Sequence, residues 1–228
     1  MSTSATEPKK KPPARGRGGS RRRPQTRMRT GLVVGLGVIV ALGVLLVVYL
    51  ANQPKTVAGS YVYEVGTPGP GQPAPDFTLE AADGSAVDLA SLRGQTVLLY
   101  FQEGLTCQPC WDQLTDIEAN MDAFQAAGID RIVTITTDPT GALRQKVTDE
   151  NITSPVLSDP DLAVSNAYQT NRYGMMGNSR DGHSFIVVGP DGVIRWRADY
   201  GGPPDFTMYL PIPALLGDIR QGLGQGAA

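Results

Sequence analysis

The chain has 228 residues, of which 41% are hydrophobic, and its formal net charge at neutral pH is −2. This length accommodates one domain of about 150 residues together with accessory segments. Its two cysteines and single histidine are too few to complete a conventional four-ligand zinc site without carboxylates, so a structural metal centre is not expected.

The small net charge hides a strongly divided chain. Residues 1–30 contain ten Lys or Arg and one acid, a net charge of +9, whereas the remainder has ten basic and twenty-one acidic residues, a net charge of −11. With almost no apolar side chains, residues 1–30 are predicted to form a disordered basic tail in the cytoplasm. Basic tails also bind nucleic acid, but the next segment explains this one more simply, so no nucleic-acid partner is expected.

Residues 31–50 carry no charge and are rich in Val, Leu, Gly and Ile. As a helix this segment is about 30 Å long, the thickness of the hydrocarbon core of a bilayer. The arginines just before it predict a cytoplasmic N-terminus and an extracytoplasmic C-terminal part. A cleaved signal peptide is the alternative, but the apolar stretch is long and no clear cleavage site follows it. The segment is therefore predicted to be a single-pass signal anchor in the cell membrane.

The rest of the chain divides into a linker, a domain and a tail. Residues 51–72 contain several Gly and Pro and are predicted to be a linker. Residues 73–222 are predicted to be the folded domain, and residues 223–228 a disordered tail.

The first part of the domain shows strand patterns followed by a helix pattern. Strands at 77–79 and 87–89 flank the turn Asp83-Gly84, which predicts a hairpin. The continuous apolar run at 96–101 predicts a strand that is buried on both faces. A helix ending near Gly128 follows, because apolar residues recur every three or four positions. These residues are Trp111, Leu114, Ile117, Met121 and Phe124.

The second part alternates between helices and strands. Asp138 and Asp159 each precede a proline, which predicts N-caps for helices near 139–150 and 160–168. The remaining expected elements are a buried strand at 131–136, a hairpin of strands at 185–188 and 193–197, and a helix at 211–222. This order predicts an α/β domain in which helices flank a mixed sheet.

The only two cysteines form the motif Cys107-Gln108-Pro109-Cys110, where the strand pattern changes into the helix pattern. A thiolate at a helix start is stabilised by free backbone N–H groups and by the helix dipole. Cys107 is expected at an exposed tip as the nucleophile, with Cys110 positioned to resolve a mixed disulfide on it. Pro109 suits the first helical turn, because its missing N–H costs nothing there. A purely structural disulfide is the alternative, although so short a loop removes little entropy from the unfolded chain.

From residue 73 to residue 216 the chain resembles the thioredoxin-fold redoxin group. That group contains membrane-tethered thiol-disulfide oxidoreductases and the alkyl hydroperoxide reductase/thiol-specific antioxidant proteins. The resemblance rests on Ala74-Pro75-Asp76-Phe77-Thr78-Leu79, Leu92-Arg93-Gly94, the Cys-x-x-Cys motif, Phe185 to Val188, and Asp191-Gly192. It implies a thioredoxin-like fold.

The cysteine motif, the resemblance and the predicted anchor together predict an extracytoplasmic thiol-disulfide oxidoreductase that needs no metal or organic cofactor. Its expected partners are disulfides and thiols of proteins or small molecules, and an electron donor in the membrane. Two alternatives stay open: a thiol-dependent, peroxiredoxin-like peroxidase with antioxidant activity, and a non-catalytic binding module with a structural disulfide.

The chain departs from both family patterns near its motif. Thioredoxin-like oxidoreductases usually have a cis-proline before the strand equivalent to 185–188, where this chain has Gly182-His183-Ser184. Peroxiredoxins carry Pro-x-x-x-Thr-x-x-Cys. Counted back from Cys110, Glu103 takes the place of the proline and Thr106 lies one position too early; counted back from Cys107, Tyr100 and Gly104 take the places of the proline and the threonine. A standard peroxidatic site is therefore not expected.

His183 is the one histidine that could lie beside the cysteines, where it would stabilise a thiolate or relay a proton. The favoured alternative is a partly exposed histidine at a strand end with a backbone hydrogen bond. Pro109 and Thr106 are the other expected supporting residues. Glu103 and Asp112 are expected to be exposed and receive no role. Three arginines are candidates for binding an anionic substrate, and the alternative is that their charged groups are simply solvated at the surface. They are Arg180, Arg195 and Arg197.

Overall fold

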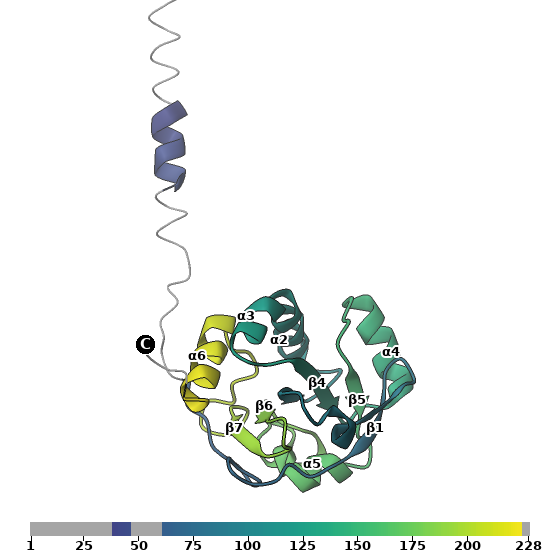
Figure 1. The fold of residues 1–228 in the computed structure, drawn as a ribbon. Helices are drawn as coiled ribbons and strands as arrows, with labels where there is room; N and C mark the ends of the chain where they lie inside the picture. Colours follow the sequence, from purple (N-terminus) through teal and green to yellow (C-terminus); the bar gives the residue numbers. More distant parts are fainter. Residues whose placement is uncertain (1–37, 47–60, 225–228) are drawn as a thin grey trace, which may run out of the picture. The chain divides into compact units, whose positions relative to one another are not determined.

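The computed structural model describes residues 38–46 and 61–224, which belong to two separate units, Met1–Lys55 and Thr56–Ala228 (Figure 1). Residues 38–46 are helical. The flanking parts of the predicted span, 31–37 and 47–50, lie outside the described residues, as do the predicted basic tail and residues 225–228. No helix among the described residues is both long and apolar enough to cross a membrane.

The second unit is built on a seven-stranded mixed sheet with the order β2-β1-β5-β4-β3-β6-β7. The strands are β1 (Thr78–Ala81), β2 (Ala86–Asp88), β3 (Val97–Phe101), β4 (Arg131–Thr136), β5 (Val156–Ser158), β6 (Ser184–Val188) and β7 (Ile194–Asp199). The central strands β3, β4 and β5 are parallel, and β6 and β7 continue the sheet in antiparallel fashion. The predicted mixed sheet and both predicted hairpins are confirmed.

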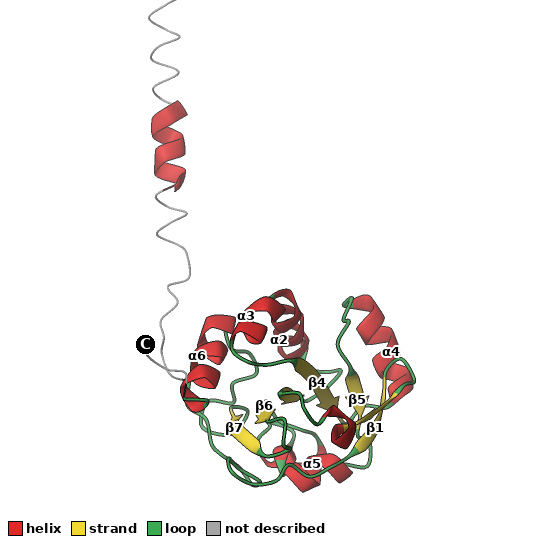
Figure 2. Ribbon diagram, viewed as in Figure 1, coloured by secondary structure: helices red, strands yellow, loops and turns green. Residues whose placement is uncertain are grey.

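Helices cover both faces of this sheet (Figure 2). The α-helices are α2 (Gln108–Ala119), α3 (Met121–Ala126), α4 (Thr140–Asp149), α5 (Ala163–Tyr168) and α6 (Ile212–Gly222). Three short 3₁₀ helices are η1 (Leu89–Leu92), η2 (Thr170–Arg172) and η3 (Gly177–Ser179). This arrangement is the α/β thioredoxin-like fold that the sequence predicts.

The alternation of side chains along β3 divides the core into two layers. Leu98 and Tyr100 point to the layer formed with α2, α3, α4 and α6. Leu99 and Phe101 point to the opposite layer, which contains α5 and η1. All residues of β3 are buried, as expected for a strand covered on both faces. Helix α2, which follows β3 after a short loop, packs in the first of these layers.

The structure differs from the sequence prediction in four places. The single helix expected to end near Gly128 is two helices, because the chain turns at Asn120, whose side-chain amide donates to the Asp116 carbonyl at 2.8 Å. The short strand β5 was not predicted from the sequence; it lies between β1 and β4 in the sheet. Asp138 does not cap α4, whose N-cap residue is Pro139. Asp159 is likewise not the N-cap residue of α5, because the helix begins at Ala163 and its N-cap residue is Leu162. The Asp159 carboxylate nevertheless accepts from the backbone N–H groups of Val164 and Ser165 in the first turn.

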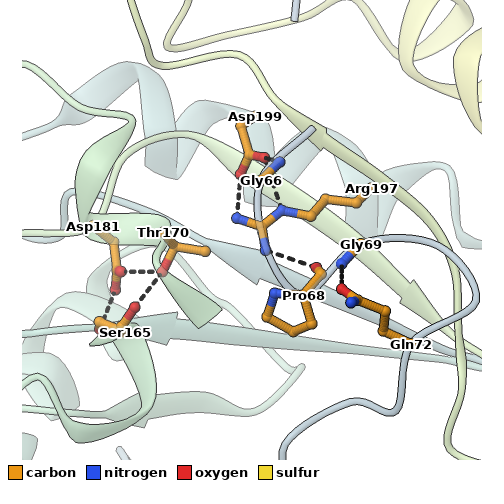
Figure 3. Close-up of polar contacts among 9 residues, drawn as sticks. All are labelled: Gly66, Pro68, Gly69, Gln72, Ser165, Thr170, Asp181, Arg197 and Asp199. Atoms are coloured by element: carbon orange, nitrogen blue, oxygen red, sulfur yellow. Dashed lines mark hydrogen bonds and ion pairs between the residues drawn. The ribbon is translucent and has the colours of Figure 1, made fainter. Parts of the chain in front are cut away.

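Residues 64–74, which we call the N-terminal strap, follow the outer edge of β7. Backbone hydrogen bonds join Glu64 to Asp199 in both directions, at 3.0 and 2.9 Å, and join the strap to Ile194 in both directions further on. The buried ion pair between Arg197 and Asp199 also holds the strap, since Asp199 accepts from the Gly66 N–H at 2.8 Å (Figure 3). Most of the described part of the predicted linker thus runs alongside the sheet.

Candidate active site

Cys107 and Cys110 are joined by a disulfide at the start of α2, with their Cα atoms 5.3 Å apart. Cys107 is the N-cap residue of the helix, and Pro109 lies in its first turn as expected. Cys107 is 7% exposed and Cys110 is fully buried. Cys107 is therefore the more exposed of the two cysteines, as predicted. The prediction that it lies at an exposed tip is wrong, because most of its surface is covered.

The loop from β3 to Cys107 is held by one buried carboxylate. Asp138 accepts from the Leu105 N–H at 2.7 Å and from the Arg180 guanidinium at 3.0 Å. Arg180 also donates to the Glu103 carbonyl at 2.8 Å, so its guanidinium links the backbone of the loop to the Asp138 carboxylate. Gly104 has φ +89°, and a Cβ there would lie 1.8 Å from the Asp138 carboxylate. The approach of Asp138 to the loop therefore requires glycine at position 104.

A second buried chain of hydrogen bonds reaches Cys110 from the sheet. The Tyr100 hydroxyl donates to the Cys110 carbonyl at 3.1 Å and lies 3.2 Å from Nδ1 of His183. Because the hydroxyl proton is used on the carbonyl, Nδ1 of His183 must carry a proton and donate to the Tyr100 oxygen. Burial lowers the pKa of His183 to about 3 and raises the pKa of Tyr100, so both groups are neutral near pH 7.

His183 therefore lies near the motif, but not in the environment that the sequence favoured. The prediction of a partly exposed side chain is wrong, because His183 is fully buried and its ring contacts Tyr100 and Phe185 edge-on. Nε2 of His183 has no hydrogen-bond partner among the described residues. A neutral ring cannot stabilise a thiolate by charge, which leaves orientation and proton transfer as its possible contributions.

The other predicted residues around the motif have different fates. Thr106 is exposed in the turn before Cys107. Glu103 was expected to be exposed but is 4% exposed, and its carboxylate accepts from the Met175 N–H at 2.7 Å. Asp112 is exposed and accepts from the Gln108 side chain at 2.9 Å.

The three candidate arginines lie in three different parts of the domain and form three different ion pairs. Arg180 lies at the cysteine loop, as described above. Arg195 pairs with Asp191 on the surface of the hairpin, and Arg197 is buried in its ion pair with Asp199. Only Arg180 therefore lies near the cysteines.

The chemistry that this arrangement allows is two-electron redox exchange at sulfur. No group of three or more His, Cys, Asp or Glu in the described part of the chain could hold a metal ion. The two cysteines are bonded to each other within one helical turn, a geometry that allows exchange between dithiol and disulfide.

Sequence reasoning missed Tyr100, Asp138 and Met208 as parts of this site. Tyr100 looked like an ordinary strand residue, and Asp138 looked like a helix cap. Met208 belongs to one small buried cluster with the two cysteines, although it lies about a hundred residues away along the chain. A tyrosine inside an otherwise apolar buried run was the one available signal, because a buried hydroxyl needs a hydrogen-bond partner.

One protein family and several known proteins match the part of the chain that contains the cysteine pair. Residues 70–197 match the AhpC/TSA family model. The putative peroxiredoxin Rv2521 of Mycobacterium tuberculosis is 38% identical over 130 residues, which are 55% of this chain and 81% of that protein. Peroxiredoxin Bcp of Escherichia coli is 33% identical over 128 residues, with the same two coverages of 55% and 81%. The thiol-disulfide oxidoreductase ResA of Bacillus subtilis is 27% identical over 101 residues, 44% of this chain and 56% of that protein.

Solved structures support the fold. The peroxidoxin BcpB of Mycobacterium tuberculosis superposes with a TM-score of 0.56 at 18% identity, over 70% of this chain and 99% of the other. AhpC of Enterococcus faecalis gives a TM-score of 0.56 at 15% identity, over 67% and 90%. At these identities the likeness concerns the fold alone.

Proposed function

The chain belongs to the AhpC/TSA family of thiol-based oxidoreductases, and on this premise we propose that it is a thiol-dependent peroxidase working through Cys107 and Cys110. The observation that carries the proposal is a closed cysteine pair at a helix start in a chain whose relatives above 30% identity are named peroxiredoxins. The ResA match is weaker in identity and coverage, so the comparisons favour a hydroperoxide over a disulfide as the oxidising substrate.

The proposed reaction uses the two sulfurs in sequence. The Cys107 thiolate attacks the O–O bond of a hydroperoxide, takes one oxygen as sulfenic acid, and releases the alcohol or water once a proton is added. The Cys110 thiol then attacks the Cys107 sulfur, which forms the disulfide and releases water. Two electrons from a thiol donor restore the dithiol. The product of this cycle is the bonded pair that the structure contains.

Thiol-disulfide exchange is the second candidate, and the immediate surroundings of the motif favour it. In the peroxiredoxin pattern counted back from the proposed nucleophile Cys107, Tyr100 replaces the proline and Gly104 replaces the threonine. A resolving partner one helical turn from an accessible thiolate suits attack on a substrate disulfide equally well.

The deciding experiment measures both activities on one preparation of the full-length protein. Consumption of hydrogen peroxide and of cumene hydroperoxide is followed with dithiothreitol as donor, and reduction of a protein disulfide is followed in parallel. A protein in which both cysteines are replaced by serine is the blank. Peroxide turnover that requires both cysteines supports the proposal, whereas disulfide turnover alone transfers the assignment to the second candidate. With neither activity, and a reduction potential well below about −300 mV, the bond is structural.

We further propose that the domain works on the extracytoplasmic side, anchored by residues 31–50. The uncharged run and the arginines before it support this placement. A membrane protein that carries electrons across the bilayer is then the expected class of donor. Release of the full-length protein from membranes by alkaline carbonate would contradict the anchor.

Tyr100 and His183 are proposed as positioning residues that act on the first turn of α2. Tyr100→Phe removes the donor to the Cys110 carbonyl and leaves the buried Nδ1–H of His183 without a partner, at a cost of about 1–3 kcal/mol in folding stability. The expected result is a shifted reduction potential of the cysteine pair and about a tenfold slower reaction.

Tyr168→Phe is the matched control for this prediction. Tyr168 is also a buried tyrosine, and its hydroxyl donates to the Pro75 carbonyl at 2.8 Å in the opposite core layer. Both variants should lose similar stability in denaturant unfolding, but Tyr168→Phe should keep the wild-type potential. Equal potentials in all three proteins would leave Tyr100 with a purely structural role.

A further inference from the structure

Three sulfur-containing residues form a buried cluster of their own. Cys107, Cys110 and Met208 pack together apart from the two core layers, with exposures of 7%, 0% and 8%. One methionine side chain thus packs in the same small cluster as two potential thiolates. Apart from the disulfide, no step in the proposed reaction uses this arrangement.

Met208 is held in place from both sides. It lies in the segment between β7 and α6, where the Thr207 N–H donates to the Tyr200 carbonyl at 3.1 Å. Two residues after Met208, the Leu210 N–H donates to the buried Gln113 side chain of α2 at 2.6 Å. These bonds tie the segment to the residue that follows β7 and to the helix that carries the cysteines, so the backbone on either side of Met208 is fixed.

The donor set is soft and contains no oxygen. Thiolate and thioether sulfurs select Cu(I), whereas zinc favours four ligands drawn from Cys, His and carboxylates. The described residues provide no cluster of three or more His, Cys, Asp or Glu, which excludes a site of the zinc type there. Cu(I) is satisfied by two or three sulfurs in a nearly dry environment, which this cluster provides.

We propose that the reduced protein binds one Cu(I) ion through the sulfurs of Cys107, Cys110 and Met208. The disulfide must first take up two electrons and two protons from a thiol reductant. Binding of Cu(I) then displaces the two thiol protons, and the Met208 thioether adds as a neutral third ligand. A bound ion occupies both sulfurs, so copper binding and disulfide formation exclude each other.

The test uses the full-length protein, reduced with dithiothreitol, freed of the reductant and kept without oxygen. Cu(I) is titrated in competition with the chelator bicinchoninate, and the sulfur ligands are counted by X-ray absorption. One ion per chain with three sulfurs is the expected result. Met208→Leu keeps a similar volume but removes the thioether, so the count should fall to two sulfurs and the dissociation constant should rise about tenfold, or about 1.4 kcal/mol.

Met121→Leu is the matched control, because Met121 is a partly buried methionine packed on the other cluster and should bind copper as the wild type does. The inference is overturned if the reduced protein binds no Cu(I), or if Met208→Leu binds it with unchanged affinity and sulfur count. The peroxide assay on copper-free wild type is independent of this outcome, so failure of the copper site and failure of the proposed function remain distinguishable.

Discussion

Cys107→Ser is expected to slow substrate reduction by about 10³-fold or more, because a serine hydroxyl is a far weaker nucleophile than a thiolate. Cys107 is the more exposed of the two cysteines, and it is the N-cap residue of α2, next to the free N–H groups of the first helical turn. Loss should appear in a single turnover as well as in the steady state. Stopped-flow mixing of the reduced variant with hydrogen peroxide measures this first step.

Cys110→Ser is the matched variant and should behave differently. The first step at Cys107 stays intact, but no resolving thiol remains, so Cys107 accumulates as sulfenic acid. Intact-mass measurement after one equivalent of peroxide should show the gain of one oxygen atom. The reverse pattern, with oxygen gained by Cys107→Ser and nothing by Cys110→Ser, would make the fully buried Cys110 the nucleophile.

Asp181 should make the stability of the domain depend on pH, because its buried surroundings favour the protonated form of its carboxyl group. The Ser165 hydroxyl lies 2.6 Å from the Asp159 carboxylate and 3.0 Å from that of Asp181. Ser165 has one hydroxyl proton to give, so both contacts are hydrogen bonds only when one of the two carboxyl groups is protonated. Asp159 already accepts from two backbone N–H groups, which favours the proton on Asp181. Thr170 lies 2.6 Å from the other Asp181 oxygen (Figure 3). Burial raises the pKa of Asp181 to about 7, against an ordinary value of 3.8.

The direction of this effect follows from proton uptake. Between about pH 4 and pH 7 the folded protein keeps a proton at Asp181 that the unfolded chain has lost. The stabilisation is therefore complete below pH 4, declines as the pH rises, and is lost above pH 7. Each unit of difference in pKa is worth about 1.4 kcal/mol, which gives roughly 4 kcal/mol in total.

Asp181→Asn should remove this dependence, since the amide stays neutral and can still donate to Ser165 and accept from Thr170. Denaturant unfolding from pH 5 to pH 8.5 should show the variant gaining stability over the wild type as the pH rises. Asp205→Asn, at an exposed position, is the control. Parallel curves for Asp181→Asn and the wild type would contradict a buried proton on Asp181.

His183 opposes Asp181 over much of the same pH range. Its pKa is lowered to about 3 from 6.5, so folding favours the neutral ring and stability from this group falls as the pH drops below 6.5. The wild type should therefore show a shallow dependence on pH. The difference between the wild type and Asp181→Asn isolates the aspartate, because the histidine contribution is common to both.

The parts of the site that the sequence predicted are local in the chain. Buried strand, tight loop and helix follow one another within residues 96–119, so their periodic patterns place Cys107 at the start of α2. The hairpin of β6 and β7 was likewise predictable, because the turn residues Asp191-Gly192 lie between two apolar runs. The order of these elements predicted a mixed sheet flanked by helices, and the resemblance to the redoxin group implied that the fold is thioredoxin-like.

The parts that the sequence did not predict depend on contacts between distant residues. An aspartate before a proline is typical of a helix cap, but Asp138 instead binds Leu105 and Arg180, at separations of 33 and 42 residues. Strand β5 is too short to produce a periodic signal and is defined by its neighbours β1 and β4. The burial of His183 likewise depends on side chains from other strands.

The N-terminal strap has a consequence for how the domain can associate with other chains. An open sheet edge offers unpaired N–H and C=O groups to any extended peptide, and this is a common route to aggregation. At β7 those groups are taken at both ends, since Asp199 pairs with Glu64 and Ile194 pairs with Gln72. The opposite edge of the sheet is the three-residue β2. Strand addition at the β7 edge would therefore require the strap to peel away first, breaking its contacts with the buried Arg197–Asp199 pair.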